Sequence, residues 1–270
     1  MGGPVFGYQD PESWAAKHHQ WQYRAAYWPG TEDVEAYIAA AKKGALTIAE
    51  VGIWNNVLHP DPAIRKAHIA KAVERLELAE RVGARCAVNV AGSRGERFDG
   101  PHPDDLSDET MDMLAETIRG IIDEVKPAHT FYTLETMPWM FPDDAESALE
   151  LVRRVDRKAF GIHFDPVNMI NCPRRYFSSR AFVRDYIEKV GPHIVAVHLK
   201  DVLLEKTLTT HLREVRPGLG GFDIAGFFQE IRALRDVTVM LEHLPSEEEY
   251  GLAWDHIAGL EGSPLKAPRS

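Results

Sequence analysis

Four side chains that can bind a metal ion stand at the ends of four short apolar segments in the second half of the chain. They are Glu135 in FYTLETMPW, Asp165 in GIHFDPVN, His198 in IVAVHLKD and Glu242 in VTVMLEHL. The intervals between them are 30, 33 and 44 residues. Each interval suits one unit of a buried strand and a helix, the last with a long loop. The spacing therefore predicts that four successive strands present these side chains at one rim.

Three carboxylates and one imidazole favour Mn²⁺, with Mg²⁺, Co²⁺, Fe²⁺ or Zn²⁺ as alternatives, although Zn²⁺ more often binds His and Cys. A lone carboxylate at a strand end is more often a helix N-cap or half of a loop salt bridge. Each of these four residues, however, closes an apolar run, where an unpaired charge is costly. A single divalent cation would compensate all of them, so the sequence predicts one metal site.

Short apolar segments alternate with longer amphipathic ones along nearly the whole chain, which is typical of parallel strands and helices. Eight strands are expected, at 4–9, 23–28, 47–54, 85–91, 130–136, 160–165, 194–200 and 237–244. Helices are expected at 31–43, 62–84, 107–125, 143–155, 178–190, 223–234 and 246–260.

This alternation favours a closed α/β barrel of the (β/α)8 type, a TIM barrel, over an open doubly wound sheet. No G-x-G-x-x-G turn follows the first expected strand, which argues against dinucleotide binding. The glycine-rich stretch 218–221 is expected to be a turn in a long loop. We predict one barrel domain over residues 1–261 and a flexible tail at 262–270.

Composition excludes several classes of protein. The 270 residues include 31 Lys and Arg against 41 Asp and Glu, for a net charge of −10, which disfavours binding to nucleic-acid phosphates. No apolar run is long enough to cross a membrane, and the first residues do not resemble a secretory signal. Two cysteines are too few for a disulfide framework or a thiolate metal site. The expectation is a soluble, cytoplasmic protein that binds neither nucleic acid nor membrane.

The motifs resemble those of the sugar phosphate isomerase/epimerase superfamily, the xylose isomerase-like barrels that include D-tagatose 3-epimerase, hydroxypyruvate isomerase and inosose dehydratase. The resemblance covers nearly the full length and is most specific in LETMPW, HFDPVN, VHLKD, EVRPGLGGFD and MLEHLPSEEEY. It implies that Glu135, Asp165, His198 and Glu242 bind one divalent metal. It also implies that the two glutamates move a proton next to the carbonyl of a sugar or keto-sugar, through a metal-stabilised enediolate.

Two positions depart from the ketose epimerases. Asn168 replaces a histidine and Phe141 replaces a glutamate, and both family residues help to hold the ketose. The HLKD sequence around Lys200 is instead similar to inosose dehydratase. A lyase that expels water or the aglycone of a 3-keto-glycoside, C-glycosides included, is therefore an alternative to an isomerase or epimerase. A non-catalytic sugar-binding barrel or partner subunit is a third reading, and the resemblance also suggests a homo-oligomer.

Further residues near the expected rim complete the candidate site. By strand alternation Lys200 points to the same side as His198. It is expected either to act in catalysis, by binding a substrate oxygen or polarising a carbonyl, or to form a salt bridge with Asp165 or Glu242. His163 also faces inward, as a core histidine, a general base or a partner of a ligand. The candidates for substrate binding are Arg216, Trp54, His59, Trp139, Asn89 and Asn168. Asn89 and Asn168 stand where the endonuclease IV branch of the superfamily needs histidines, so that activity is not expected.

Overall fold

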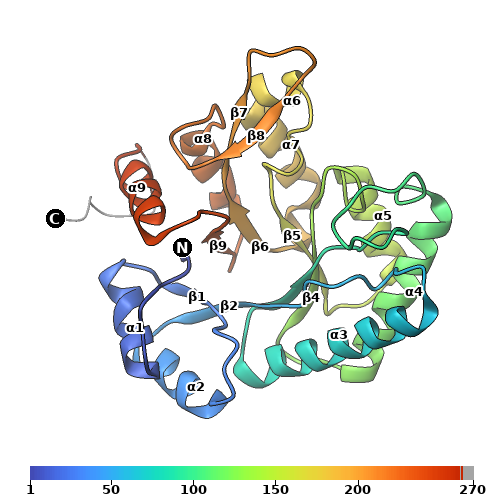
Figure 1. The fold of residues 1–270 in the computed structure, drawn as a ribbon, viewed down its shortest axis with the longest axis horizontal. Helices are drawn as coiled ribbons and strands as arrows, with labels where there is room; N and C mark the ends of the chain where they lie inside the picture. The colour runs from blue at the N-terminus through green and yellow to red at the C-terminus, as the bar shows by residue number, and fades with distance from the viewer. Residues whose placement is uncertain (262, 264–270) are drawn as a thin grey trace.

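The computed structural model describes residues 1–261 and 263, and a sheet of seven parallel strands lies at its centre. In sheet order the strands are β1 (Ala25–Tyr27), β2 (Thr47–Gly52), β3 (Cys86–Asn89), β4 (Phe131–Glu135), β5 (Phe160–Phe164), β6 (Ile194–Leu199) and β9 (Thr238–Leu241). The strands run side by side with the helices outside them (Figure 1). The predicted xylose isomerase-like (β/α)8 barrel is confirmed, although its first strand is not where the sequence suggested.

The prediction of a strand at 4–9 is wrong, because those residues form a loop. Gly2 takes the place of the first strand and bridges Ala25 of β1 and Met240 of β9. Its amide donates to the carbonyl of Val239 at 2.9 Å, and its own carbonyl accepts from Leu241 at 2.9 Å. A Cβ at Gly2 would clash with the carbonyl oxygen of Ala25, so only glycine fits this close approach. The barrel is therefore closed by a single residue between its first and last long strands.

The helices surround the sheet as α1 (Pro11–Gln20), α2 (Val34–Lys43), α3 (Pro62–Val82), α4 (Asp108–Val125), α5 (Ala145–Val155), α6 (Pro173–Phe177), α7 (Ser179–Val190), α8 (Ile224–Glu230) and α9 (Glu247–Ala258). Each of the seven predicted helices has a counterpart. Helix α1 was not predicted, although its capping box between Asp10 and Ser13 is written in the sequence DPES. Among the described residues, none of the helices combines the length and apolar character that a membrane crossing requires.

Apolar packing between the sheet and the helices holds the strands in register. Helix α4 shows the pattern, because its buried Leu114, Ile118, Ile121 and Ile122 recur every three or four residues along one face. These residues belong to one large cluster that runs between the strands and all the long helices. The barrel thereby becomes a rigid frame that fixes where each strand ends.

A hairpin follows β6, where the sequence suggests only a long loop. Strands β7 (Asp201–Leu204) and β8 (Leu212–Val215) pair antiparallel and project beyond the barrel (Figure 1). Of the tail predicted at 262–270, residues 262 and 264–270 lie outside the described part of the chain.

Candidate metal centre

The four predicted ligands converge at the carboxyl ends of four neighbouring strands. Glu135 is the last residue of β4, His198 is the penultimate residue of β6, and Asp165 and Glu242 directly follow β5 and β9. One ligand atom from each lies within 4.8 Å of those of the other three. The Nδ1 atom of His198 is 3.0 Å from Glu135 Oε1 and 3.0 Å from Glu242 Oε2. Strands that are 30 to 44 residues apart in sequence thus build one compact donor set, as their spacing predicted.

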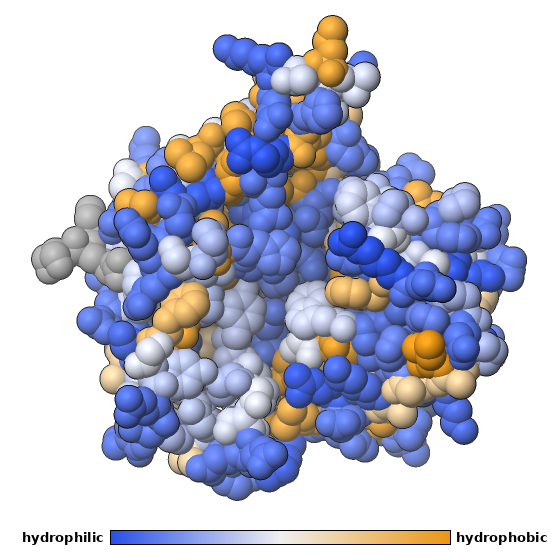
Figure 2. All heavy atoms as spheres, viewed as in Figure 1, coloured by the Kyte–Doolittle hydropathy of each residue, from blue (hydrophilic) through white to orange (hydrophobic). Residues whose placement is uncertain are grey.

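The cluster is nearly closed off from solvent. Asp165 and His198 are fully buried, Glu135 is 5% exposed, and the side chain of Glu242 is 10% exposed. The face of the molecule seen in Figure 2 is hollowed near its middle, where hydrophilic side chains gather. Water is thus largely excluded from the four ligands, which strengthens every electrostatic interaction among them.

Lys200 supplies a cation inside the same cluster. Its Nζ atom lies 2.8 Å from Asp165 Oδ2 and 2.6 Å from Glu242 Oε1, and it donates to Asn168 Oδ1 at 3.1 Å. The lysine is 2% exposed, so these contacts replace its hydration. Of the two roles considered for Lys200, the ion pair with the acidic ligands is the one present in this geometry.

The charges of the cluster perturb one another strongly. Burial raises the pKa of Asp165 above its usual range in spite of the nearby Lys200 ammonium. Burial acts in the same direction on Glu135 and Glu242, but the His198 and Lys200 charges hold the pKa of each glutamate below its usual range. The carboxylates in turn raise the pKa of His198 and of Lys200 well above their usual values, against the effect of burial. The carboxylates of the cluster thus favour the protonated forms of His198 and Lys200 and would attract a further cation.

The donor atoms fit a divalent cation. Asp165 Oδ2 and Glu242 Oε1 are buried and share the single ammonium of Lys200, at 2.8 Å and 2.6 Å. The three carboxylates of Glu135, Asp165 and Glu242 thus exceed the positive charge of one lysine and one imidazole, and a divalent ion would balance the remainder. Glu135, Asp165, His198 and Glu242 would hold the ion, because a set of oxygens and one imidazole suits a hard or borderline divalent metal.

Backbone and side-chain hydrogen bonds around Asp165 fix its orientation. Its Oδ1 accepts the amides of Val167 at 2.8 Å and Asn168 at 3.0 Å, which leaves Oδ2 turned toward the other ligands. The Thr136 hydroxyl accepts the Asp165 amide at 2.8 Å and donates to its carbonyl at 2.9 Å. The Asn168 side-chain amide also donates to Glu135 Oε1 at 3.2 Å. Asn168, predicted to bind substrate, therefore lies directly beside the ligands and links Asp165 to Glu135.

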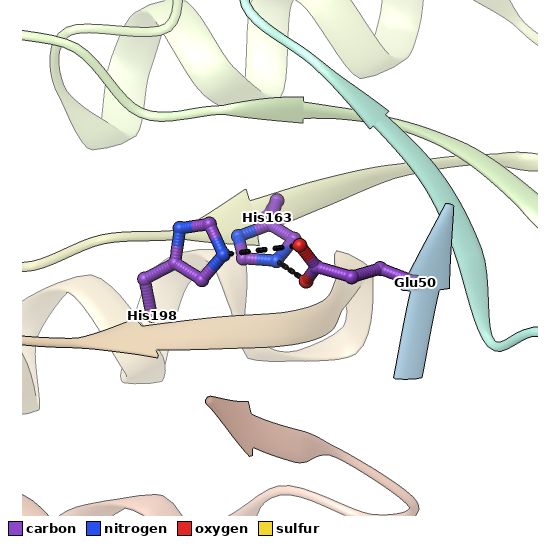
Figure 3. A group of neighbouring side chains, drawn as sticks. All are labelled: Glu50, His163 and His198. Carbon is purple, nitrogen blue, oxygen red and sulfur yellow. Dashed lines mark hydrogen bonds and ion pairs between the residues drawn. The ribbon is translucent and has the colours of Figure 1, made fainter. Parts of the chain in front are cut away.

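A fourth acidic residue, Glu50 on β2, lies in the same cluster and was missed in the sequence. It is 2% exposed and faces the two imidazoles of His163 and His198 from the opposite side of the barrel (Figure 3). Burial raises the pKa of Glu50, but His198 and His163 outweigh that effect and bring the pKa to about 2. The signal that could have revealed it is a single acidic residue inside the apolar segment TIAEVG.

Two residues at the mouth of the site adopt a left-handed backbone that side chains rarely take. Trp54 has φ of 48° and stacks its indole over His198 with ring centroids 6.4 Å apart. His243 has φ of 58°, follows Glu242 directly, and its Nδ1 lies 3.2 Å from Glu214 Oε1. Such strain is typical of sites where a side chain must point in one direction. Both rings remain partly exposed, so both can meet a ligand.

A hollow of about 620 Å³ adjoins Trp54 and is also lined by Lys71, Arg97 and Phe98. Aromatic faces together with hydrogen-bonding side chains are common in small-molecule sites. Trp139, another predicted substrate residue, is 40% exposed, and its indole donates at 3.0 Å to the carbonyl of Asp99, which also lines the hollow.

The remaining predicted residues are engaged elsewhere in this structure. Arg216 pairs with Glu249 of α9, with Nε 2.8 Å from the carboxylate. His59 accepts the Asp61 amide through Nδ1 at 3.1 Å, beside the start of α3. Asn89 is fully buried and accepts the Asn55 amide at 3.0 Å. These three residues hold the loops around the mouth, and their predicted contact with substrate stays a prediction.

Comparison with known proteins places the fold in a family. The model of the family described as xylose isomerase-like TIM barrel matches residues 12–259. No curated protein sequence matches this chain at a significant level.

Solved structures share the architecture over nearly the whole chain. The 3-keto-D-glucoside 4-epimerase of E. coli has a TM-score of 0.70 and 15% identity, over 96% of each chain. The probable 3-DHS dehydratase AsbF of Bacillus anthracis has a TM-score of 0.63 and 19% identity, over 91% of this chain and 84% of its own. A xylose isomerase-like TIM barrel protein of Mycobacterium smegmatis, solved with magnesium, has a TM-score of 0.64 and 16% identity, over 92% and 87%. At these identities the likeness shows the fold alone.

Proposed function

The chain belongs to the xylose isomerase-like TIM barrel family, and from that premise we propose that it is a divalent-metal-dependent isomerase or epimerase of a sugar or keto-sugar. The observation that carries the proposal is the convergence of Glu135, Asp165, His198 and Glu242, with their ligand atoms within 4.8 Å of one another. The donor set favours Mn²⁺, and the magnesium in the Mycobacterium smegmatis protein supports a hard divalent ion.

The bound cation would draw electrons from the substrate's carbonyl oxygen and stabilise the negative charge that develops when the neighbouring carbon loses its proton. The protein's own part is to move that proton. Glu135 and Glu242 end strands β4 and β9, which are separated in the sheet by β5 and β6, so they approach the site from different directions. One glutamate would remove the proton as general base and the other would return a proton to the opposite face.

Other residues would hold these two glutamates in their working positions. Asn168 donates to Glu135 Oε1, and the Lys200 ammonium lies 2.6 Å from Glu242 Oε1. Trp54 offers its indole face above His198, where the apolar face of a sugar ring could stack. Together these contacts support a small polyhydroxylated substrate between Trp54 and the four ligands.

Elimination is the second candidate reaction, and Lys200 is the observation that favours it. Its ammonium stands beside Glu242 in the same buried cluster, so it could stabilise the negative charge on an oxygen leaving from the carbon β to the carbonyl. The probable 3-DHS dehydratase AsbF of Bacillus anthracis shares the fold. An isomerase or epimerase returns the proton and retains the carbon skeleton, whereas a lyase releases water or the aglycone.

Exchange of a carbon-bound proton with solvent tests the proposal. The protein is stripped with a chelator, reloaded with Mn²⁺, and incubated in D₂O with a panel of keto-sugars and 3-keto-glucosides. Mass spectrometry should find metal-dependent uptake of one deuterium next to the carbonyl, or loss of water or aglycone. We expect Glu135→Gln and Glu242→Gln each to slow the reaction by about 10²–10⁴-fold.

The matched control is Glu74→Gln, an exposed glutamate on α3 far from the site. It should react at the rate of the unaltered protein. Exchange that persists in both Glu135→Gln and Glu242→Gln would refute the acid–base roles. Absence of any reaction across the panel with Mn²⁺ bound would instead favour a sugar-binding barrel without catalysis.

A further inference from the structure

Glu50, His163 and His198 form a buried cluster directly behind the metal ligands. They come from β2, β5 and β6, and all three are at most 2% exposed. His163 Nε2 lies 2.9 Å from Glu50 Oε2, and His198 Nε2 lies 3.3 Å from Glu50 Oε1. Figure 3 shows the carboxylate presenting one oxygen to each ring. Glu50 therefore contacts His198 at Nε2, and Glu135 and Glu242 contact it at Nδ1.

The chemistry of a carboxylate determines which nitrogen of each ring carries a proton. A carboxylate only accepts hydrogen bonds, so both Nε2 atoms must be donors when they bond to Glu50. In a neutral imidazole the other nitrogen, Nδ1, then has a free lone pair. In this structure His198 Nδ1 lies 3.0 Å from an oxygen of Glu135 and of Glu242, so it also donates a proton to carboxylates. A divalent ion at the four ligands would displace that proton, and the tautomer with its proton on Nε2, which Glu50 favours, would then offer the ion the Nδ1 lone pair.

His163 serves Glu50 rather than the ligands. Its ring lies 4.0 Å from that of His198, between centroids, and its Nδ1 is buried without a hydrogen-bond partner. Its one polar contact of hydrogen-bonding length within the described residues is with Glu50. The bond fixes the second oxygen of the carboxylate and so prevents Glu50 from turning away from His198.

We propose that Glu50 is a positioning residue that fixes the tautomer and orientation of His198 for metal binding, and that His163 locks Glu50 in place. This inference rests on the metal centre of the proposed function, because it concerns how that centre is prepared. Loss of a residue that hydrogen-bonds to a metal-bound histidine commonly weakens metal binding by about 10–100-fold.

The variant Glu50→Gln tests the proposal, because an amide has one accepting oxygen for two imidazole donors. One of the two rings must then change its tautomer, so that its Nε2 accepts a hydrogen bond, or lose its hydrogen bond to residue 50. We expect Mn²⁺ to bind about 10–100-fold more weakly to Glu50→Gln, as measured by the electron paramagnetic resonance signal of free Mn²⁺. The matched control is Glu80→Gln, which removes a carboxylate that accepts the amides of Ala128, His129 and Thr130 far from the site. It should bind Mn²⁺ as the unaltered protein does.

A pair of variants at His163 provides rescue by a conservative change. His163→Gln keeps an N–H that can donate to Glu50, whereas His163→Leu has none. Metal affinity should fall in the leucine variant and stay close to normal in the glutamine variant. If affinity is equal in the two, His163 has no locking role and that part of the proposal is wrong.

Nuclear magnetic resonance of the unaltered protein keeps the proposal testable even if Glu50→Gln does not fold. With ¹⁵N-labelled histidine and diamagnetic Mg²⁺ bound, His198 should carry its proton on Nε2. A proton on Nδ1, or unchanged Mn²⁺ affinity in folded Glu50→Gln, would overturn the role of Glu50 while leaving the metal centre intact. Failure of the unaltered protein to bind Mn²⁺ would instead overturn both the metal centre and this inference.

Discussion

Lys200 carries much of the positive charge of a cluster that is otherwise acidic. Glu50, Glu135, Asp165 and Glu242 all end in carboxylates within the barrel mouth, and the lysine ammonium contacts two of them. Breaking a buried ion pair by removing one partner leaves an uncompensated charge, which costs more than an exposed pair is worth. A divalent cation at the proposed site would act on the same oxygens as the lysine, and each would reduce the charge that the other must balance.

We therefore expect Lys200→Met to lower the free energy of unfolding of the metal-free protein by about 3–5 kcal/mol. The reason is that Asp165 and Glu242 lose their nearest cation. Adding Mn²⁺ should recover part of the loss, since the ion stabilises the native state by mass action. Urea unfolding followed by circular dichroism, with and without Mn²⁺, measures both effects.

Lys189→Met is the control for this change, because Lys189 is exposed and pairs with Asp185 one helical turn away. Its unfolding free energy should change by at most about 0.5 kcal/mol. Equal stability of Lys200→Met and Lys189→Met would show that Lys200 does not balance the cluster.

Among the individual residues of the cluster, the sequence indicated those at strand ends and missed Glu50, which lies within a strand. Glu135, Asp165, His198 and Glu242 were predictable because each closes an apolar run at a regular interval. Glu50 lies within β2, where no strand end draws attention to it, and its partners are more than 100 residues away. Arg216 was singled out for its motif, but nothing in the sequence indicated its ion pair with Glu249 on another element.

The loop after the β7–β8 hairpin is the element whose shape depends most on one side chain. The Asp201 carboxylate accepts four backbone amides, from Val202 at 2.8 Å, Gly218 at 3.0 Å, Gly220 at 2.9 Å and Phe222 at 3.0 Å. Burial raises the pKa of Asp201, while these amides oppose the rise. The arrangement ties the glycine-rich stretch to the end of β6, beside Lys200 and the metal ligands.

A side chain at Gly220 would meet this carboxylate, so Gly220→Ala should loosen the loop. Its Cβ would lie 2.2 Å from Asp201 Oδ1 and 2.3 Å from the carbonyl oxygen of Val202. We expect a loss of about 1–3 kcal/mol of stability. Amide hydrogen exchange over residues 218–222 should quicken, and mass spectrometry of peptic fragments would measure it.

Gly120→Ala is the matched control, because a Cβ there meets open space on helix α4. Alanine favours a helix more than glycine does, so this variant should gain up to about 1 kcal/mol and leave exchange in the loop unchanged. Unchanged exchange at 218–222 in Gly220→Ala would contradict the role given to Asp201.

Helices with strong sequence signals were predicted well, and elements defined by pairing were not. Helix α3 begins at Pro62 and ends before Gly83, which adopts φ of 67°, so residues at its own two ends determine where it starts and stops. The β7–β8 hairpin and the bridging role of Gly2 depend on partners elsewhere in the chain. Apolar residues at 4–9 suggested a strand, but the gap between β1 and β9 is narrow enough that Gly2 alone fills it.

At the scale of the molecule, closure of the barrel brings the charged strand ends together. An open sheet would leave β2 at one side and β6 far from it, whereas the closed order places Glu50 against His198 across the interior. The parallel order also turns every strand end toward the same face, which is the face hollowed in Figure 2. The alternation in the sequence predicted this closure, and the closure in turn accounts for the convergence of the four proposed ligands.

Metal content of the purified protein is the measurement that decides whether this account holds. Elemental mass spectrometry, after incubation with Mn²⁺ and removal of free ions, should find about one divalent ion per chain. His198→Ala should hold almost none, whereas His193→Ala, at the other end of β6, should hold as much as the unaltered protein. Equal metal content in His198→Ala and the unaltered protein, or none in either, would contradict a metal centre formed by Glu135, Asp165, His198 and Glu242.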